Sequence, residues 1–292
     1  STYAWVASAS KPFLVTVPLR GGTFTEGIIG APKSINPVLA STEPDRALSQ
    51  LLYSGLMRSS TTGTIEPDLA STYTISPDGL VYTFTLRDHL KWSDGKPLTS
   101  SDVVFTINKL ATLSIDDQTR IRFGQLQTRA PSPTTIVFTL QTPQPEFLST
   151  LTVGILPEHI WGSVTDDAFT TAPENLDPIG SGPYRLKTIS FTNGIAKVVT
   201  LTQNKQYARS RPFIRKYRMM FFANQTELVS ALKQGDIDMT FGVTPEDSLP
   251  LQNSSLIFRK IESPYSVTLF RHRGESILMN QAIVQLLQSA ID

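Results

Sequence analysis

The first hydrophobic patterns along the chain predict strands followed by a helix. Apolar and β-branched residues at 13–17 and 23–29 lie on either side of Gly21-Gly22, which predicts two strands joined at a turn. From Glu43 to Leu56, leucine and alanine recur three and four positions apart, the spacing of a helix that buries one face. The N-terminal region therefore predicts a mixture of strand and helix.

Alternation of apolar and polar residues then predicts two hairpins. Residues 72–75 and 81–86 alternate with a period of two, and Ser76-Pro77-Asp78-Gly79 between them has the Pro and Gly that tight turns favour. Residues 126–130 and 135–140 predict a second hairpin with two prolines in its turn. The first half of the chain is therefore expected to contain antiparallel sheet.

Between the hairpins, Trp92 to Val103 predicts an exposed turn that runs into a helix. Asp94-Gly95 supplies the turn, and Thr99 with Asp102 three positions later resembles a capping box. An apolar stripe at helical spacing follows at Val103, Val104, Ile107 and Leu110. Taken alone, this stretch is either architecture, with Trp92 packed in the interior, or a ligand site.

The second half of the chain changes in character. Segment 143–182 is rich in Pro and Gly and predicts irregular structure that ends near a boundary between lobes. A strand at 218–222, a helix at 225–234 and a strand at 237–241 predict a βαβ unit, a parallel pair with a right-handed crossover. Further strands are expected at 184–191, 196–203, 256–262 and 265–271, and a last helix at 277–291.

Composition and charge narrow the class of protein. The chain has 292 residues, enough for about two average domains, and 40% of them are hydrophobic. A net charge of +1 gives no reason to expect a nucleic-acid partner or a polybasic membrane surface. The absence of cysteine excludes disulfides, thiolate metal sites and cysteine nucleophiles. No apolar run reaches the ~20 residues of a membrane-spanning helix.

Candidate catalytic chemistry is sparse. His89, His159 and His272 have no metal-ligand spacing, and we interpret them as structural. No nucleophile elbow, His-Glu-x-x-His or phosphate-binding loop is present. The sequence therefore predicts no enzyme, no metal site and no cofactor, unless two carboxylates converge in a closed pocket. Six aromatic residues are expected mainly in the core, with a few at a cleft: Trp92, Phe123, Phe147, Trp161, Tyr184 and Tyr207.

An ordered set of short motifs is more specific than any of these features. Its members are Ser34-Ile35-Asn36-Pro37, Tyr53-Ser54-Gly55-Leu56, Pro67-Asp68-Leu69-Ala70, the stretch 76–87, Lys91-Trp92-Ser93-Asp94-Gly95, the stretch 156–161, Gly180-Ser181-Gly182-Pro183-Tyr184, Asn204-Lys205-Gln206-Tyr207 and Gly235-Asp236-Ile237-Asp238. In order and spacing, this set resembles the family 5 extracellular solute-binding proteins, the dipeptide- and oligopeptide-binding components of ABC importers. The resemblance extends along residues 20–241.

The resemblance implies a mixed α/β fold of the periplasmic-binding-protein type II, in the large cluster with an extra peripheral subdomain. It implies that ligand binds between two lobes and that hinge closure buries it in a partly hydrated pocket. Peptide binders of this kind hold the peptide main chain and its charged ends, which tolerates many peptide sequences. The implied partners are a short peptide and the permease subunits of an ABC importer, outside the cytoplasm.

The resemblance also points to cleft residues. Gly30-Ala31-Pro32-Lys33 matches the family segment that lines the cleft from the first lobe, although Pro32 has no N–H to offer a peptide. Segment 182–184 matches the place where the chain re-enters the first lobe, which implies a position at the hinge or rim. The expected ligand-binding residues are Ala31, Pro32, Lys33, Gly182, Pro183 and Tyr184.

The implied domain order interrupts the first lobe with the peripheral subdomain. We expect residues 1–32 and 180–258 in the first lobe, 33–179 in the peripheral subdomain and 259–292 at the start of the second lobe. Asn280-Gln281-Ala282-Ile283 and Ala290-Ile291-Asp292 resemble a helix near the start of that second lobe. Most of the second lobe is therefore expected to be missing from the chain. Such a chain is expected to bind ligand weakly or not at all, and to form a non-native dimer through exposed apolar surface.

Three functions remain open from the sequence. The first is a peptide receptor of an ABC importer, in the periplasm or at the outer face of the cytoplasmic membrane, with an anchor expected upstream of Ser1. The second is a receptor for another solute, such as a nickel chelate, haem or an oligosaccharide. The third is a ligand-sensing domain of the same fold within a regulator, which an upstream helix-turn-helix would indicate.

Overall fold

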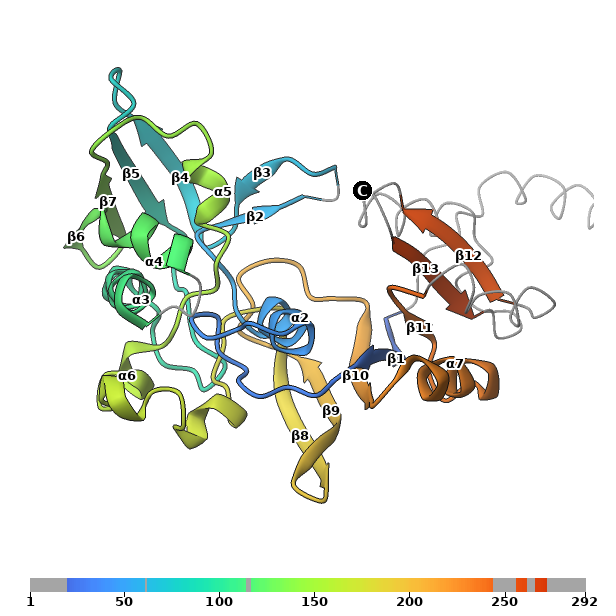
Figure 1. The fold of residues 1–292 in the computed structure, drawn as a ribbon. Coiled ribbons are helices and arrows are strands. Elements are labelled where there is room, and N and C mark those ends of the chain that lie inside the picture. The colour runs from blue at the N-terminus through green and yellow to red at the C-terminus, as the bar shows by residue number, and fades with distance from the viewer. Residues whose placement is uncertain (1–19, 61, 114–116, 244–255, 262–265, 272–292) are drawn as a thin grey trace, which may run out of the picture.

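A seven-stranded mixed sheet organises one part of the structure. The computed structural model describes residues 20–60, 62–113, 117–243, 256–261 and 266–271. The strand order in the sheet is β12-β13-β11-β1-β10-β9-β8, as Figure 1 shows in part. These strands are β1 (Gly21–Ile29), β8 (Tyr184–Thr192), β9 (Ile195–Gln203), β10 (Ile214–Phe222), β11 (Met239–Thr240), β12 (Leu256–Ile261) and β13 (Ser266–Arg271).

Strand β1 is inserted between the two strands of the expected βαβ unit. Helix α7 (Gln225–Gln234) joins β10 to β11 with the predicted helix bounds. Both strands are parallel to β1, and each pairs with it from its own side. The two strands are therefore parallel to each other, as predicted, but they are not neighbours in the sheet. The local sequence of 218–241 specifies the unit but carries no sign that a strand near the N-terminus fills its middle.

The two faces of this sheet are covered differently. Because side chains alternate along a strand, Ile28 faces the main hydrophobic core, whereas Gly27 faces α7. A Cβ atom at Gly27 would lie 2.5 Å from Ile237 Cδ1 and 2.7 Å from Leu228 Cδ1, so glycine allows α7 to pack this closely. Nearer the start of β1, the same face carries threonines and basic side chains instead of apolar ones.

A second, four-stranded sheet with the order β4-β5-β7-β6 lies at the upper left of Figure 1. Its strands are β4 (Ala70–Ile75), β5 (Val81–Leu86), β6 (Gln127–Ser132) and β7 (Thr135–Thr139). Both predicted hairpins are confirmed, since β4 pairs with β5 and β6 with β7 in antiparallel fashion. Phe84, Phe138 and Phe147 are fully buried, and Phe138 contacts each of the other two edge to face, which holds this sheet to α5.

Short elements complete this second part of the chain. The helices are α3 (Ser100–Leu113), α4 (Asp117–Gly124), α5 (Phe147–Thr150) and α6 (Glu158–Trp161), with the 3-10 turns Asp166–Ala168 and Pro173–Leu176. The strands β2 (Met57–Ser59) and β3 (Ile65–Pro67) form a small separate hairpin. Segment 143–182 is thus mostly irregular, as its Pro and Gly content predicts.

The turn at Trp92 is structural. The Trp92 side chain is fully buried. The Ser93 N–H donates to Gly180 O at 2.9 Å, and His159 Nε2 lies 2.8 Å from Asp94 Oδ2. The turn therefore ties two distant segments together. Its capping box is half formed, because the Thr99 N–H donates to Asp102 Oδ2 at 2.8 Å while the Thr99 hydroxyl bonds Ser101 instead.

Two expectations near the N-terminus need correction. Gly21-Gly22 opens β1 and does not form a turn ahead of it, because Gly21 is already paired with Ile214. Helix α2 (Glu43–Leu52) ends four residues before the predicted Leu56. Leu56 is buried at a bend after the helix, and its carbonyl accepts from the Asp68 and Ala70 N–H groups. The predicted strand at 13–17 and helix at 277–291 lie outside the described residues.

Candidate functional site

The segment after β1 is fixed by helix α2. The Gly30 N–H donates to Phe222 O at 2.9 Å, and Gly30 has a positive φ of 95°, which lets the chain turn off the sheet. The N–H groups of Lys33 and Ser34 then donate to Asp45 Oδ1 at 2.8 and 2.9 Å. The chain beyond the carboxyl end of β1 is therefore held by a side chain from the first turn of α2.

Asp45 serves the helix and the loop at the same time. Its second oxygen, Oδ2, accepts from the Thr42 hydroxyl at 2.6 Å, and its N–H donates to that hydroxyl at 3.3 Å. The pair forms a capping box at the N-terminus of α2. Of the expected ligand-binding residues here, Pro32 is buried, Ala31 is partly buried and the Lys33 side chain is exposed.

The second expected group, at 182–184, is packed against the other end of α2. The Gly182 N–H donates to Leu52 O at 2.8 Å, and a Cβ atom at Gly180 would lie 1.8 Å from the same oxygen. The buried Tyr184 hydroxyl donates to Ile214 O at 3.0 Å, and burial raises the pKa of Tyr184 to about 12. These residues join the end of α2 to the first strand of the β8–β9 hairpin.

The two expected groups therefore share α2 but not a pocket. Asp45 and Leu52, their contacts on the helix, are seven residues apart, which is about 10 Å along its axis. None of the six residues lines either of the two hollows described below. Their role in ligand binding stays a prediction.

A partly apolar hollow of about 560 Å³ opens where the chain runs from β1 to α2. We call it the α2–α4 hollow. It is lined by Pro37, Val38, Leu39, Ala40, Ser41, Arg46, Ser49, Gln50, Tyr53, Leu110, Thr119, Arg122, Phe123, Thr150, Thr152, Val153 and Gly154. Apolar walls with a few polar groups are the usual make-up of a small-molecule site.

Two arginines give the α2–α4 hollow its positive charge. Arg46 extends from α2, where its Nη1 donates to Ser41 O at 2.6 Å, and Arg122 comes from α4. Both residues are exposed, so both guanidinium groups are open to a ligand. Burial raises the pKa of Tyr53 well above its usual range, so its phenol stays neutral. An arginine pair beside apolar walls suits a carboxylate on a partly apolar ligand.

The sequence did not single out this hollow. Its lining comes from four separate segments: residues 37–41, helix α2, the α3–α4 region and residues 150–154. Of the six aromatic residues expected in the core or at a cleft, only Phe123 lines the hollow, and it is 4% exposed. The sequence signal nearest to the hollow is the motif Ser34-Ile35-Asn36-Pro37. Its last residue, Pro37, begins the lining segment 37–41.

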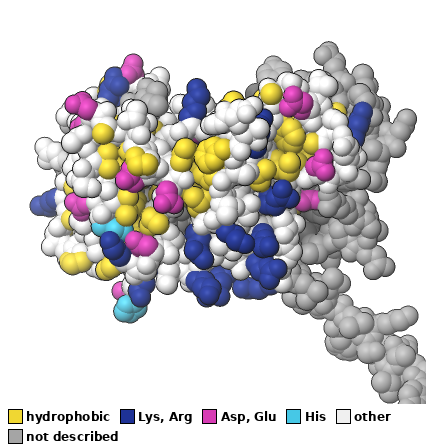
Figure 2. All heavy atoms as spheres, turned by 90° about the horizontal axis from the view of Figure 1, so that it is seen from below, with side chains coloured by type: hydrophobic (Ala, Val, Ile, Leu, Met, Phe, Trp, Pro, Cys, Tyr) yellow, Lys and Arg dark blue, Asp and Glu magenta, His cyan; other side chains and the backbone are white. Residues whose placement is uncertain are grey.

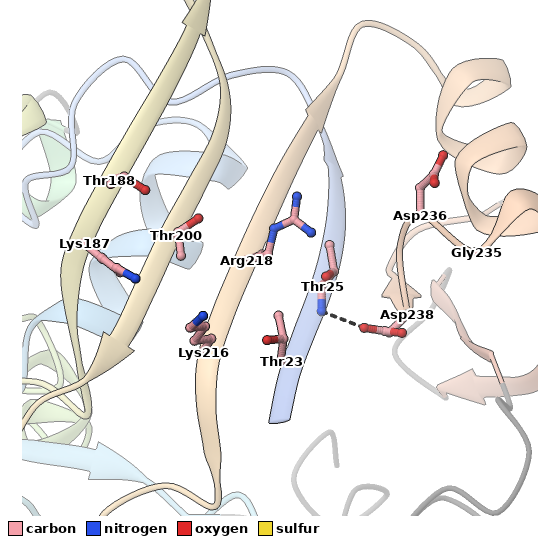
Figure 3. Close-up of a pocket in the computed structure, with 10 residues that line it drawn as sticks. All are labelled: Thr23, Thr25, Lys187, Thr188, Thr200, Lys216, Arg218, Gly235, Asp236 and Asp238. Carbon is pink, nitrogen blue, oxygen red and sulfur yellow. Dashed lines mark hydrogen bonds between the residues drawn. The ribbon is translucent and has the colours of Figure 1, made fainter. Parts of the chain in front are cut away.

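A second hollow of about 650 Å³ lies on the α7 face of the seven-stranded sheet, and we call it the sheet-face hollow (Figure 3). It is lined by Thr23, Thr25, Lys187, Thr188, Thr200, Lys216, Arg218, Gly235, Asp236 and Asp238. Apart from the backbone at Gly235, every lining side chain is polar or charged. It lacks the apolar walls of the α2–α4 hollow.

Glu26 is a buried acid on the opposite face of the same sheet. Its side chain is 4% exposed, and the Tyr217 hydroxyl donates to Oε2 at 2.7 Å. Burial raises the pKa of Glu26 to about 7 against the opposing effect of that hydrogen bond. Within the described residues, no group of three His, Cys, Asp or Glu side chains lies close enough together to hold a metal ion. No helix in that part of the chain is both long and apolar enough to cross a membrane.

Comparison with known sequences gives a consistent picture. The sequence profile of the bacterial extracellular solute-binding proteins, family 5 Middle, matches residues 64–292. A Brucella ovis protein named as a peptide-binding protein of an ABC transporter is 31% identical over 266 residues, covering 90% of this chain and 49% of its own length. The oligopeptide-binding protein AppA of Bacillus subtilis is 25% identical over 281 residues, which cover 94% of this chain and 51% of AppA. The chain thus spans about half the length of the relatives it matches.

Solved structures show the same relationship. The substrate-binding protein CtaP of Listeria monocytogenes, from an ABC transporter, is 31% identical with a TM-score of 0.70, covering 82% of this chain and 48% of CtaP. NikZ of Campylobacter jejuni, in complex with Ni(L-His), is 26% identical with a TM-score of 0.71, covering 81% of this chain and 46% of NikZ. The AppA structure with a nonapeptide has a TM-score of 0.73 at 24% identity, covering 83% and 48%, and supports the fold. The fold is mixed α/β, of the periplasmic-binding-protein type II. The chain belongs to family 5 of the bacterial extracellular solute-binding proteins.

Proposed function

We propose that this chain is part of an extracytoplasmic receptor that captures short peptides between two lobes and delivers them to the permease of an ABC importer. The proposal is supported by the family, by relatives named for peptide binding, and by a hollow whose make-up suits a peptide. The protein acts as a binder and not as an enzyme in this proposal. The same family membership supports an extracytoplasmic location.

The α2–α4 hollow is the observation that carries the proposal. In open α/β folds, ligands bind beyond the carboxyl ends of parallel strands. Residues 37–41, which line the hollow, follow directly after the loop that leaves the carboxyl end of β1. Arg46 and Arg122 would pair with the peptide carboxylate, and Val38, Leu39 and Phe123 would contact its side chains.

In this proposal, the six ligand-binding residues expected from the sequence hold helix α2 in place or lie at the rim of the cleft. Ala31, Pro32 and Lys33 form the loop that Asp45 holds in place, and the exposed Lys33 side chain is free to approach an acidic group. Gly182, Pro183 and Tyr184 anchor the far end of α2. In this proposal, 1–32 and 180–258 form the first lobe and 259–292 the start of the second lobe. Residues 33–179 form the peripheral subdomain, which supplies the whole lining of the α2–α4 hollow and borders the cleft with it.

A second candidate is a receptor for a metal chelate or another small non-peptide solute. It is favoured by the similarity to NikZ, whose structure is in complex with Ni(L-His). The exposed arginines of the α2–α4 hollow would serve such a ligand as well, because a histidine chelate also carries a carboxylate. The two candidates differ in whether peptides compete for the hollow.

Calorimetric titration with short peptides tests the proposal on the longest natural form of the protein that contains this chain. We expect binding that Arg46→Ala and Arg122→Ala each weaken by about tenfold or more, the effect of losing a charged hydrogen bond. Arg129→Ala is the matched control, because Arg129 is an exposed arginine on β6 outside the hollow. Equal effects of all three variants, or an absence of peptide binding, would contradict the proposal. We expect the 292-residue chain alone to bind weakly or not at all, because half of the cleft comes from the other lobe.

A further inference from the structure

Charge is unevenly distributed along this nearly neutral chain. Segment 184–222 contains nine of the 26 Lys and Arg residues and none of the 25 Asp and Glu residues. The segment forms β8, β9 and β10, which are neighbours at one edge of the seven-stranded sheet. The basic residues are therefore collected in space as well as in sequence. Figure 2 shows Lys and Arg side chains gathered on the lower part of the face in view.

Strand register concentrates part of this charge in the sheet-face hollow. Arg218 of β10 lies between Thr25 of β1 and Thr200 of β9, and all three side chains line the hollow. Two residues earlier on β10, Lys216 is paired with Thr23 and points to the same face. Figure 3 shows these side chains together on one side of the sheet. Neighbouring strands are about 4.8 Å apart, so across β1, β10 and β9 each basic side chain lies beside threonine hydroxyl groups.

A bulge adds a third cation from β8. The register between β8 and β9 shifts between Leu186 and Thr188. An extra residue in a strand breaks the alternation of side chains, and here Lys187 and Thr188 both line the hollow. Bulges re-aim side chains next to functional sites more often than elsewhere in sheets.

Lys187, Lys216 and Arg218 form no ion pair with another residue in the described part of the chain, whereas Arg58, Lys109, Arg120 and Arg209 all do. Two acids, Asp236 and Asp238, lie across the hollow beside α7. Asp238 Oδ2 accepts the Thr25 N–H at 2.8 Å, so part of its charge is used by the backbone. The wall formed by β8 and β10 is left positive.

We propose that the sheet-face hollow is an anion site that takes a small oxyanion with two or more negative charges, such as pyrophosphate or a phosphate monoester. Three cations on two strands, with threonine hydroxyls between them, supply the charge and the hydrogen-bond donors that such a group requires. A soluble anion fits better than a membrane surface, because Thr25 at the hollow is only 5% exposed and a flat bilayer would not reach it. The site shares no residue with the α2–α4 hollow and is independent of peptide binding.

Calorimetric titration with inorganic pyrophosphate, at low and matched ionic strength, tests this site on the full chain. We expect saturable binding that Lys216→Ala/Arg218→Ala weakens by at least about tenfold. The matched control is Lys205→Ala/Arg211→Ala, which removes two exposed cations from the same segment outside the hollow. The control should lose less than about threefold, since exposed charges act through a screened field.

A second variant and a second probe keep the test decisive. Circular dichroism establishes whether each variant is folded. If the Lys216→Ala/Arg218→Ala variant does not fold, Lys187→Ala, which changes only the β8 side of the hollow, takes its place. It should weaken pyrophosphate binding several-fold. The proposal is overturned if pyrophosphate does not bind, or if both double variants lose affinity equally. It is also overturned if the chain binds only vesicles containing phosphatidylglycerol and not pyrophosphate.

Discussion

The carboxylate of Asp45 accepts the backbone N–H of Lys33 at 2.8 Å, and this contact places the chain after β1 against the start of α2. One buried side chain thereby caps a helix and shapes the approach to the α2–α4 hollow. Thr42 and Asp45 form a capping box at the start of α2, and Asp45 in addition binds the loop that precedes the helix. Asp45 therefore fixes the path of the chain toward the hollow, whose lining comes from four segments.

Asp45→Ala should therefore lower the free energy of unfolding by about 3 kcal/mol. The substitution removes the acceptor for Lys33, Ser34 and Thr42, and each hydrogen bond to a charged group contributes about 1.5–3 kcal/mol, partly offset by water. Urea unfolding measures the loss. The exposed Asp88→Ala is the control and should change stability by less than about 0.5 kcal/mol. A loss no larger than that of the control would show that Asp45 does not hold the loop.

Glu26 should make stability depend on pH. Burial raises its pKa from 4.5 to about 7 in the folded protein, so the folded state holds a proton that the unfolded state releases. The contribution to stability is complete below pH 4.5 and is lost as the pH rises through 7. At about 1.4 kcal/mol per pKa unit, the loss is on the order of 3 kcal/mol.

Glu26→Gln tests this dependence, since glutamine keeps the shape and has no proton to lose. The free energy of unfolding of the variant, measured by urea titration from pH 4 to 8, should fall less steeply with pH than that of the parent chain. At pH 8 the variant should be the more stable of the two. Identical pH profiles would mean that Glu26 titrates in the folded protein as it does in water.

Gly180→Ala should destabilise the chain more strongly than any other glycine substitution near α2. The added Cβ would meet Leu52 O at 1.8 Å, which forces the β8 strand away from the end of the helix. A cost above about 3 kcal/mol is expected for such overpacking against backbone. Gly124→Ala is the control, because nothing lies within 4 Å of its added Cβ. Thermal unfolding that is equally affected in both variants would contradict this packing.

The sequence predicted most local elements because their signals are local. Helix α7 has its predicted bounds because Asn224 caps its start and Gly235, with a φ of 81°, ends it. The spacing predicts that α2 ends at Leu56 because Leu56 continues the helical pattern, although Leu56 reaches the core from a bend after the helix. The apolar spacing predicts that Leu56 is buried, but it does not predict the backbone conformation that buries it.

Local patterns in the sequence do not predict which distant segments pack together. The insertion of β1 between β10 and β11 depends on Gly27, whose lack of a side chain lets α7 approach. The α2–α4 hollow needs α2 and α4 side by side with residues 150–154, and no local spacing encodes that meeting. The order of the short motifs led to the family, whereas the arginines of the hollow needed the structure.

Mass spectrometry of small molecules released from the natural protein that contains this chain tests most directly whether it is a peptide receptor. The protein is purified without added ligand, denatured, and its low-mass fraction is sequenced. A heterogeneous set of short peptides is the expected result, because recognition through main chain and carboxylate tolerates many side chains. Recovery of one defined non-peptide compound, such as a metal chelate, would contradict peptide capture and favour the second candidate.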